Sequence, residues 1–171
     1  MTPVDAFIGL GSNLADPERQ LAAAVTELAS LPMTTLVAQS PFYASRPVGP
    51  QDQPDFINGA VWLRTELPPL ALLDHLQAIE LAHGRERIQH WGPRTLDLDL
   101  LIYGDNVIND ERLTVPHPEL VNRDFALQPL LDLKPELTLP DGTSLASARA
   151  QCPDNALRKL NPLPRGTQAP V

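Results

Sequence analysis

Cysteine is scarce in this chain. Cys152 is the single cysteine among 171 residues, so a disulfide cannot form within the chain. The four histidines, His75, His83, His90 and His117, do not combine with it in the spacing of a zinc site. A disulfide framework and a Cys/His zinc centre are therefore excluded, and we expect Cys152 to be structural or incidental.

Long apolar runs are also missing. No apolar stretch approaches the roughly 20 residues that a membrane-spanning helix needs. The N-terminal residues, Met1 to Asp5, lack a basic segment followed by an apolar one, which a secretory signal would have. We therefore expect a cytoplasmic protein with no membrane partner.

Positive charge is in short supply. The formal net charge is -8, and Lys134 and Lys159 are the only lysines. A nucleic-acid-binding surface normally needs a basic face, so we expect no nucleic-acid partner. A small polyphosphate is not excluded, because a few arginines and Mg²⁺ can neutralise it locally.

Hydrophobic periodicity predicts alternating strands and helices. Strands are expected at Val4 to Leu10, Leu36 to Tyr43, 56–65 and after Pro93, and helices at 17–31 and from Pro68 to a C-capping Gly84. This order predicts a ferredoxin-like βαββαβ fold of the α+β class, with helices packed on an antiparallel sheet and long active-site loops. Residues 1–160 would form one domain and 161–171 a flexible tail.

Several shorter segments carry turn or helix signals. Gly9-Leu-Gly-Ser-Asn is expected to close the first strand with a tight turn, and it is not a dinucleotide-binding fingerprint because Leu14 replaces the third glycine. Asn106 to Asp110 is expected to be a turn. Short helices are expected after Arg123 and at 144–151.

An acidic pair lies in the most informative stretch, His90 to Tyr103. Thr95 to Leu100 alternates strictly, so Asp97 and Asp99 would share one face of a strand. Mg²⁺ is commonly held by one or two carboxylates together with substrate phosphates. A solvated acidic face is the alternative, but the strand turns apolar on both faces at Leu101, which favours a site at the mouth of a buried strand.

Arginines precede this pair. Arg85, Arg87 and Arg94 lie within about ten residues of the carboxylates, together with Trp91. Guanidinium groups match phosphate oxygens, so the cluster indicates a polyphosphate ligand. A surface salt-bridge cluster is the competing interpretation.

Other candidates have structural alternatives. Phe56 and Asn58 are two apart on a strand, which sets an aromatic ring beside an amide, although the residues alone favour a core Phe and a turn-forming Asn. Gln77 and Glu80 share a helix face. His117 stands between two prolines and could be a surface histidine, a capping group or a phosphate ligand.

Several of these residues lie in segments that resemble a known family. The segments are Gly9 to Leu14, Phe42-Tyr43, Gly49 to Asp55, Phe56 to Asn58, Trp91 to Asp99 and Leu113 to Pro118. Over roughly residues 4 to 160 the chain is similar to the 6-hydroxymethyl-7,8-dihydropterin pyrophosphokinases of folate biosynthesis. The resemblance implies a ferredoxin-like enzyme that moves the β,γ-diphosphate of ATP onto the pterin hydroxymethyl oxygen and releases AMP.

The resemblance also implies roles for single residues. Asp97 and Asp99 would hold two Mg²⁺ ions, with Arg85 and Arg94 as further catalytic residues on the phosphates. The implied pterin-binding residues are Ser45, Val48, Phe56, Asn58, Trp91 and Phe125. The implied ATP-binding residues are Gln77, Glu80, Arg87, Trp91, Arg94, Leu100, Arg112, Thr114, His117 and Arg123. Loops near 10–16, 44–55 and 84–95 would close over both substrates, and a monomer is expected.

The chain departs from the family pattern in places. Ser45 and Arg46 stand where Thr and Pro are common, Phe56 and Pro118 each replace a frequent Tyr, and the Arg85 to Trp91 loop is one residue shorter than in a familiar bacterial form. We expect these departures to affect the geometry of the loops and the rate of turnover more than the class of reaction.

Two alternative functions stay open. One is a catalytically silent ferredoxin-like module that binds a pterin or a nucleotide, and the other is a related Mg²⁺-dependent kinase that acts on another heterocycle. The intact Asp97-Leu-Asp99 motif with Arg85 and Arg94 favours an enzyme, because a pure binder needs no paired metal ligands.

Overall fold

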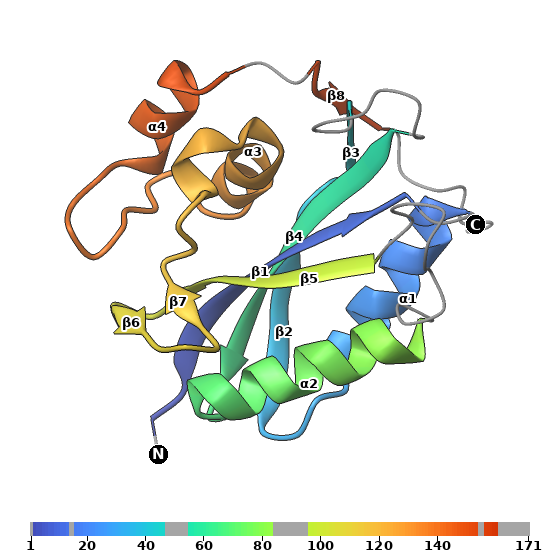
Figure 1. Cartoon of the computed structure of the whole chain (residues 1–171), viewed down its shortest axis with the longest axis vertical. Helices are drawn as coiled ribbons and strands as arrows, with labels where there is room; N and C mark the ends of the chain where they lie inside the picture. Colours follow the sequence, from blue (N-terminus) through green and yellow to red (C-terminus); the bar gives the residue numbers. More distant parts are fainter. Residues whose placement is uncertain (1, 14–15, 47–54, 84–95, 154–155, 161–171) are drawn as a thin grey trace.

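The computed structural model describes residues 2–13, 16–46, 55–83, 96–153 and 156–160. Its larger elements are β1 (Val4–Ser12), α1 (Pro17–Ala29), β2 (Thr34–Gln39), β3 (Tyr43–Ser45), β4 (Phe56–Thr65), α2 (Pro69–Ala82), β5 (Leu96–Tyr103), α3 (Asp124–Leu133) and α4 (Leu145–Gln151) (Figure 1). The short ones are β6 (Ile108–Asn109), β7 (Thr114–Val115), the 3-10 helix Leu120–Asn122 and β8 (Arg158–Lys159). The predicted Gly84 C-cap and the tail 161–171 lie outside the described residues.

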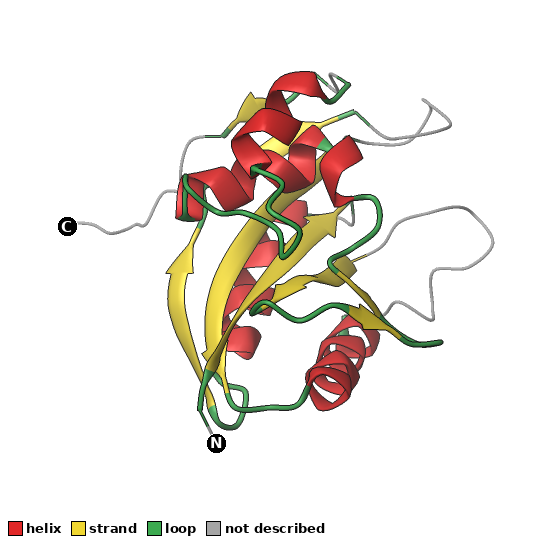
Figure 2. Ribbon diagram, turned by 90° about the vertical axis from the view of Figure 1, so that its left-hand side faces the viewer, coloured by secondary structure: helices red, strands yellow, loops and turns green. Residues whose placement is uncertain are grey.

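The main sheet runs in the order β5-β1-β4-β3-β8, and β2 also pairs with β4. All of these pairings are antiparallel. The four long strands, which are β1, β2, β4 and β5 along the chain, therefore lie side by side in the order β5-β1-β4-β2. This is the predicted ferredoxin-like arrangement. Figure 2 shows the twist of this sheet.

Each face of the sheet packs on its own helices because strand side chains alternate. On one face, Ile8, Leu63 and Leu98 form a cluster with Leu21 of α1 and Leu72 of α2. On the other face, buried residues of the sheet pack against α3 and α4. They are Phe7, Ala60, Leu101 and Ile102 on the strands, with Leu127, Leu130 and Leu145 on the helices.

The two helix layers cover the sheet unequally. In Figure 1, α1 and α2 lie together on one side, and α3 and α4 lie on the other. On that second side α3 packs mainly on β4 and β3, and Phe7 of β1 and Leu101 and Ile102 of β5 belong to the same buried cluster. The stretch of β5 that carries Asp97 and Asp99 lines a cavity.

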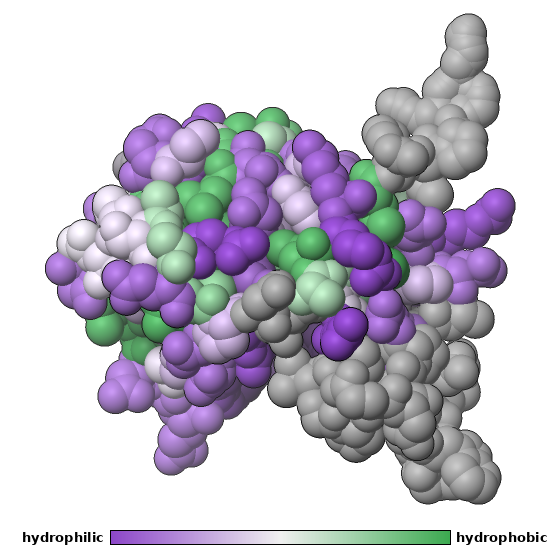
Figure 3. Space-filling view, turned by 90° about the horizontal axis from the view of Figure 1, so that it is seen from above, coloured by the Kyte–Doolittle hydropathy of each residue, from purple (hydrophilic) through white to green (hydrophobic). Residues whose placement is uncertain are grey.

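The outer surface is mixed in character. Viewed from above, hydrophilic residues are interspersed with small apolar patches (Figure 3). Across the parts of the chain that the structure describes, no helix has both the length and the apolar character to cross a membrane.

The turn predicted at Gly9 to Asn13 is wrong. β1 continues through Gly9 and Gly11 to Ser12, and it pairs with a strand on each side. Two glycines followed by Ser12 and Asn13 suggested a turn, but Gly9 and Gly11 sit where the side chains of Leu101 and Asn58 come close to the main chain.

The second predicted strand is broken in two. Instead of one strand from Leu36 to Tyr43, the chain forms β2 and β3, which pair with successive parts of β4. Pro41 lies in the break and has no N–H to donate to a ladder. Ser40 keeps the break attached, because its N–H donates to the Ala60 carbonyl oxygen at 2.9 Å and its Oγ accepts from the Ala60 N–H at 2.9 Å.

Two shorter predictions differ in outcome. The segment Asn106 to Asp110, predicted as a turn, contains β6, whose Ile108 and Asn109 pair with Val115 and Thr114 of β7. The last predicted helix is confirmed as α4, with Ser144 as its N-cap: the Ser147 N–H donates to Ser144 Oγ at 3.2 Å.

Candidate active site

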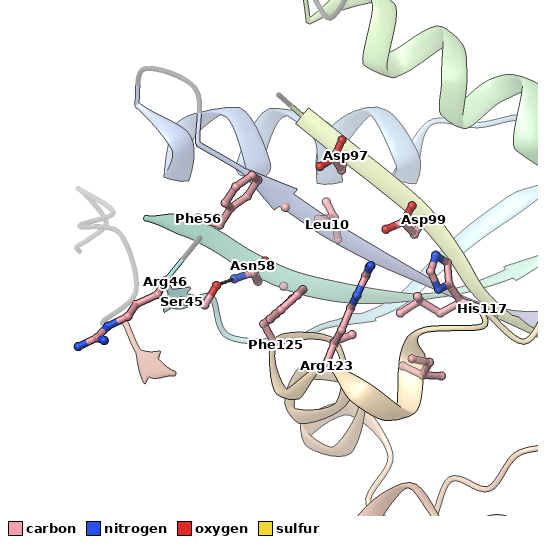
Figure 4. A pocket seen from close by; sticks show the side chains of 16 residues that line it. Leu10, Ser45, Arg46, Phe56, Asn58, Asp97, Asp99, His117, Arg123 and Phe125 are labelled. Carbon is pink, nitrogen blue, oxygen red and sulfur yellow. Dashed lines mark hydrogen bonds between the residues drawn. The ribbon is translucent and has the colours of Figure 1, made fainter. Parts of the chain in front are cut away.

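A cavity of about 230 Å³ lies between the start of α3 and the part of the sheet that carries Asp97 and Asp99. Eight of the predicted site residues line it, and they come from β3, β4, β5, α3 and the segments next to α3 (Figure 4). They are Ser45, Phe56, Asn58, Asp97, Asp99, His117, Arg123 and Phe125.

The acidic pair stands on the cavity side of β5. Leu96, Leu98 and Leu100 are buried on the opposite face, whereas Asp97 and Asp99 are only partly buried. The predicted alternation is therefore confirmed. The residues opposite the two carboxylates on β1 are glycines, Gly11 beside Asp97 and Gly9 beside Asp99, so no β1 side chain separates the carboxylates from the cavity.

The donor set limits which metal could bind. Within the described ranges, no three or more His, Cys, Asp or Glu side chains are grouped so that they could hold a metal ion. A site with two carboxylates does not suit a structural zinc ion, which needs four protein ligands. It fits Mg²⁺, which keeps several waters and takes one or two carboxylates together with phosphate oxygens.

Asn58 is oriented by a buried hydrogen bond. Its Nδ2 donates to Ser45 Oγ at 2.8 Å, and both side chains are at most 4% exposed. Asn58 lies opposite Gly11 of β1, and a Cβ at position 11 would come within 3.2 Å of Asn58 Oδ1. The glycine therefore leaves the space that the amide occupies.

Arg123 and Phe125 approach from the other wall. The Arg123 guanidinium carbon lies 5.9 Å from the centroid of the Phe125 ring, within cation–π range. Phe125 belongs to α3, whereas Phe56 belongs to β4, so two aromatic rings enter the cavity from different layers of the fold (Figure 4).

His117 is held in place by the main chain. Its N–H donates to the Leu101 carbonyl oxygen at 3.0 Å, and its ring Nδ1 accepts the Glu119 N–H at 3.1 Å. Burial lowers the pKa of His117; the Asp99 carboxylate raises it, Arg123 lowers it and Glu119 raises it, in that order of size. A neutral ring whose Nδ1 accepts carries its proton on Nε2, so His117 can act as a donor there.

Five predicted ATP-binding residues lie away from the cavity. Arg112 Nη2 donates to Gln77 Oε1 at 3.2 Å and to Asp74 Oδ1 at 2.6 Å. Glu80 Oε2 accepts the main-chain N–H of Leu98 at 2.8 Å, between the two aspartates. Leu100 is buried in the core, and Thr114 is exposed on β7.

The remaining predicted site residues, Val48, Arg85, Arg87, Trp91 and Arg94, lie outside the described residues.

Sequence reasoning missed part of the cavity wall. The further lining residues are Gly9, Leu10, Gly11, Arg46, Gly59, Leu101, Leu120 and Ala126. A signal existed for the glycines, because glycine inside a strand often marks a close approach of other groups. The sequence marks Arg46 only as a departure from the family pattern, and Figure 4 shows its side chain pointing away from the other labelled residues.

Fold and cavity together define a class: a ferredoxin-like α+β protein whose acidic pair, arginine and aromatic rings face one cavity, as a metal-assisted phosphate-transferring enzyme requires. The family model for 7,8-dihydro-6-hydroxymethylpterin-pyrophosphokinase matches residues 7–135. The chain belongs to this pyrophosphokinase family.

Relatives of similar length agree. The chain is 48% identical over 159 residues to the 2-amino-4-hydroxy-6-hydroxymethyldihydropteridine pyrophosphokinase of Haemophilus influenzae, covering 93% of this chain and 99% of the relative. It is 52% identical over 154 residues to the Pseudomonas aeruginosa protein of the same name, covering 90% and 95%.

Solved structures share the fold at low identity. A crystal structure of HPPK-DHPS in complex with substrates gives a TM-score of 0.69 at 12% identity, and it covers 88% of this chain. A wild-type Plasmodium falciparum HPPK-DHPS gives 0.65 at 13% identity over 87% of this chain. The chain spans 43% and 44% of those longer proteins, so they support its fold alone.

Proposed function

We propose that this chain transfers the β,γ-diphosphate of ATP to the hydroxymethyl group of 6-hydroxymethyl-7,8-dihydropterin, as a step of folate biosynthesis. The carrying observation is one cavity that joins the acidic pair Asp97 and Asp99 to two aromatic walls and a fixed amide. Membership of the family supports the same reaction.

The apolar and amide end of the cavity is the proposed pterin site. The rings of Phe56 and Phe125 offer flat faces to a planar heterocycle. Asn58, held by Ser45, presents its amide to the hydrogen-bonding edge of the ring. Val48 and Trp91 are proposed to complete this site.

The acidic end is the proposed phosphate site. Asp97 and Asp99 would hold two Mg²⁺ ions, which neutralise and polarise phosphate oxygens when bound. The pterin hydroxymethyl oxygen attacks the β-phosphorus of ATP, and the bond from that phosphorus to the α,β-bridging oxygen breaks, so AMP leaves. The hydroxyl proton passes to water as the new bond forms, and Asp97 is proposed to lie next to that hydroxyl.

Cationic and donor groups are proposed to position ATP. Arg123 and the Nε2–H of His117 face the acidic end of the cavity, where phosphate oxygens would lie. Arg85 and Arg94 are proposed as catalytic contacts to the phosphates. The other proposed ATP-binding residues are Gln77, Glu80, Arg87, Trp91, Leu100, Arg112 and Thr114.

The protein is further proposed to act as a cytoplasmic monomer. Its two small-molecule substrates explain the cavity without a nucleic-acid or membrane partner.

The deciding experiment is product analysis. The purified chain is incubated with ATP, Mg²⁺ and 6-hydroxymethyl-7,8-dihydropterin, and AMP is separated from ADP. We expect Mg²⁺-dependent AMP together with a diphosphorylated pterin. ADP with a monophosphorylated pterin would mean that another phosphorus is attacked, and tight pterin binding without turnover would favour a silent binding module.

The acidic pair supplies the matched variants. Asp97→Asn and Asp99→Asn remove one charge each and should lower turnover by about a hundredfold to a thousandfold, the size of effect seen when one charge-stabilising group is lost. Asp105→Asn is the control, because Asp105 lies exposed in the turn after the same strand. Near-normal turnover in either of the first two variants would contradict the assignment.

A further inference from the structure

A polar network away from the acidic pair joins the sheet to α3 and α4. The Tyr43 hydroxyl on β3 donates to Asp132 Oδ2 on α3. Gln128 Nε2 donates to Asp132 Oδ1 at 3.2 Å, and Arg149 Nε of α4 donates to Gln128 Oε1 at 3.2 Å. We name the bond between Tyr43 and Asp132 the Tyr43–Asp132 clamp.

The Tyr43 hydroxyl keeps its proton at neutral pH and therefore acts as a hydrogen-bond donor. Tyr43 is 6% exposed, and burial raises the pKa of its hydroxyl. The hydrogen bond to the Asp132 carboxylate raises this pKa further. The clamp therefore joins a neutral donor to a charged acceptor, which is stronger than a bond between two neutral groups.

Both ends of the clamp are close to residues of the proposed pterin site. On the sheet, Tyr43 lies directly opposite Asn58 and two residues before Ser45, so all three side chains share one face. On α3, Phe125, Gln128 and Asp132 are spaced i, i+3 and i+7, so they lie along one stripe of the helix.

The helix turn that carries Phe125 lacks one main-chain hydrogen bond. Pro129 lies inside α3, four residues after Phe125. Proline has no N–H, so it cannot donate the helical hydrogen bond that the Phe125 carbonyl oxygen would accept. The rotation of this turn about the helix axis therefore depends more on the hydrogen bond that joins Asp132, on the same stripe, to Tyr43 of the sheet.

We propose that Tyr43 and Asp132 are positioning residues for the heterocyclic substrate. Their hydrogen bond fixes the rotation of α3 against β3 and β4, and so sets the gap between the Phe125 ring and the wall formed by Phe56 and Asn58. Neither residue lines the cavity, so both act through Phe125 and Asn58. This inference rests on the proposed function.

The first test is a binding titration of three variants: Tyr43→Phe, Asp132→Ala and the double variant. The dissociation constant of 6-hydroxymethyl-7,8-dihydropterin should rise about tenfold in each, the effect of losing one hydrogen bond to a charged group. The double variant should be no weaker than the single ones, because one bond is lost in all three. The dissociation constant of a non-hydrolysable ATP analogue should change less than about twofold.

Tyr103→Phe is the matched control. The Tyr103 hydroxyl is also buried and donates to the Leu67 carbonyl oxygen at 2.6 Å, on the core side of the sheet. Its removal should lower thermal stability without changing pterin affinity. Equal pterin affinity in wild type and in Tyr43→Phe would overturn the proposal, and so would equal weakening by Tyr43→Phe and Tyr103→Phe.

A ligand-free measurement separates this inference from the proposed reaction. The NMR resonances of the Phe125 ring should shift in Tyr43→Phe and remain in place in Tyr103→Phe. Unshifted resonances in Tyr43→Phe would overturn the clamp even if the wild type bound no pterin. If the wild type formed no AMP but the Phe125 resonances shifted in Tyr43→Phe, the proposed function would be contradicted and the clamp would still be supported.

Discussion

Replacing Gly11 by alanine should weaken substrate binding without unfolding the protein. Gly11 lies on β1 between Asp97 on one side and Asn58 on the other. Its φ is not in the left-handed region, since the positive-φ glycines of the described chain are Gly104 and Gly142. The backbone therefore accepts an alanine, and only the space around the new methyl group decides the effect.

The expected magnitude follows from two distances. The added Cβ would lie 3.2 Å from Asn58 Oδ1, about 0.3 Å closer than a comfortable contact of roughly 3.5 Å. Asn58 is buried, so its amide must turn away and strain the 2.8 Å bond to Ser45 Oγ. Losing most of one hydrogen bond would raise the pterin dissociation constant about twofold to tenfold.

Folding stability should change little in the same variant. Alanine restricts the unfolded chain and thereby favours folding by about 0.4–1 kcal/mol. The strained hydrogen bond opposes this gain by about 0.5–1.5 kcal/mol. The free energy of unfolding should therefore remain within about 1 kcal/mol of the wild type.

The assay pairs a fluorescence titration of the pterin with urea denaturation. Gly9→Ala is the comparison, because the three atoms nearest its added Cβ all belong to the Leu101 side chain, the first at 3.0 Å, and none belongs to Asn58. Pterin binding should weaken more in Gly11→Ala than in Gly9→Ala. An unchanged dissociation constant in Gly11→Ala would refute the reasoning about Asn58.

Two further predictions concern His117 and Glu80. Because burial lowers the pKa of His117, the unfolded chain takes up its proton first as the pH falls through about 6.5, so acidification lowers the free energy of unfolding. His117→Gln should make the melting temperature fall less between pH 7 and pH 5, and parallel curves for variant and wild type would contradict this. Glu80→Ala removes an acceptor of the Leu98 N–H and should lower the free energy of unfolding by about 1–3 kcal/mol in urea denaturation. Glu80→Gln keeps an acceptor oxygen, so an equal loss in that variant would show that the hydrogen bond is not responsible.

Local periodicity predicted what depends on local geometry. The alternation from Leu96 to Leu100 predicted which face of β5 carries Asp97 and Asp99, because side-chain direction on a strand repeats every two residues. The bounds of the strand β4 were predicted in the same way, and those of α4 from helix signals. The break between β2 and β3 did not, because it depends on the pairing of Ser40 with Ala60, twenty residues away.

The composition of the cavity was predictable only in part. The spacing of Arg123 and Phe125 says nothing about β5, because their approach to Asp97 and Asp99 is set by tertiary packing of α3 on the sheet. These two residues entered the prediction through the family resemblance. Gly9 and Gly11 were interpreted as a turn because glycine serves tight turns and close packing alike, and the sequence does not distinguish the two uses.

The short strand β8 has a consequence for engineering. The family match ends at residue 135, yet β8 pairs with β3, and the Leu160 N–H donates to the Phe42 carbonyl oxygen at 2.9 Å. Leu145 of α4 is fully buried in the cluster beneath α3.

Cutting the chain at the end of the match would therefore leave β3 as a bare edge and expose the apolar side of α3. A chimera between members of this family should exchange β3 and residues 136–160 together, because β3 pairs with β8 in that segment.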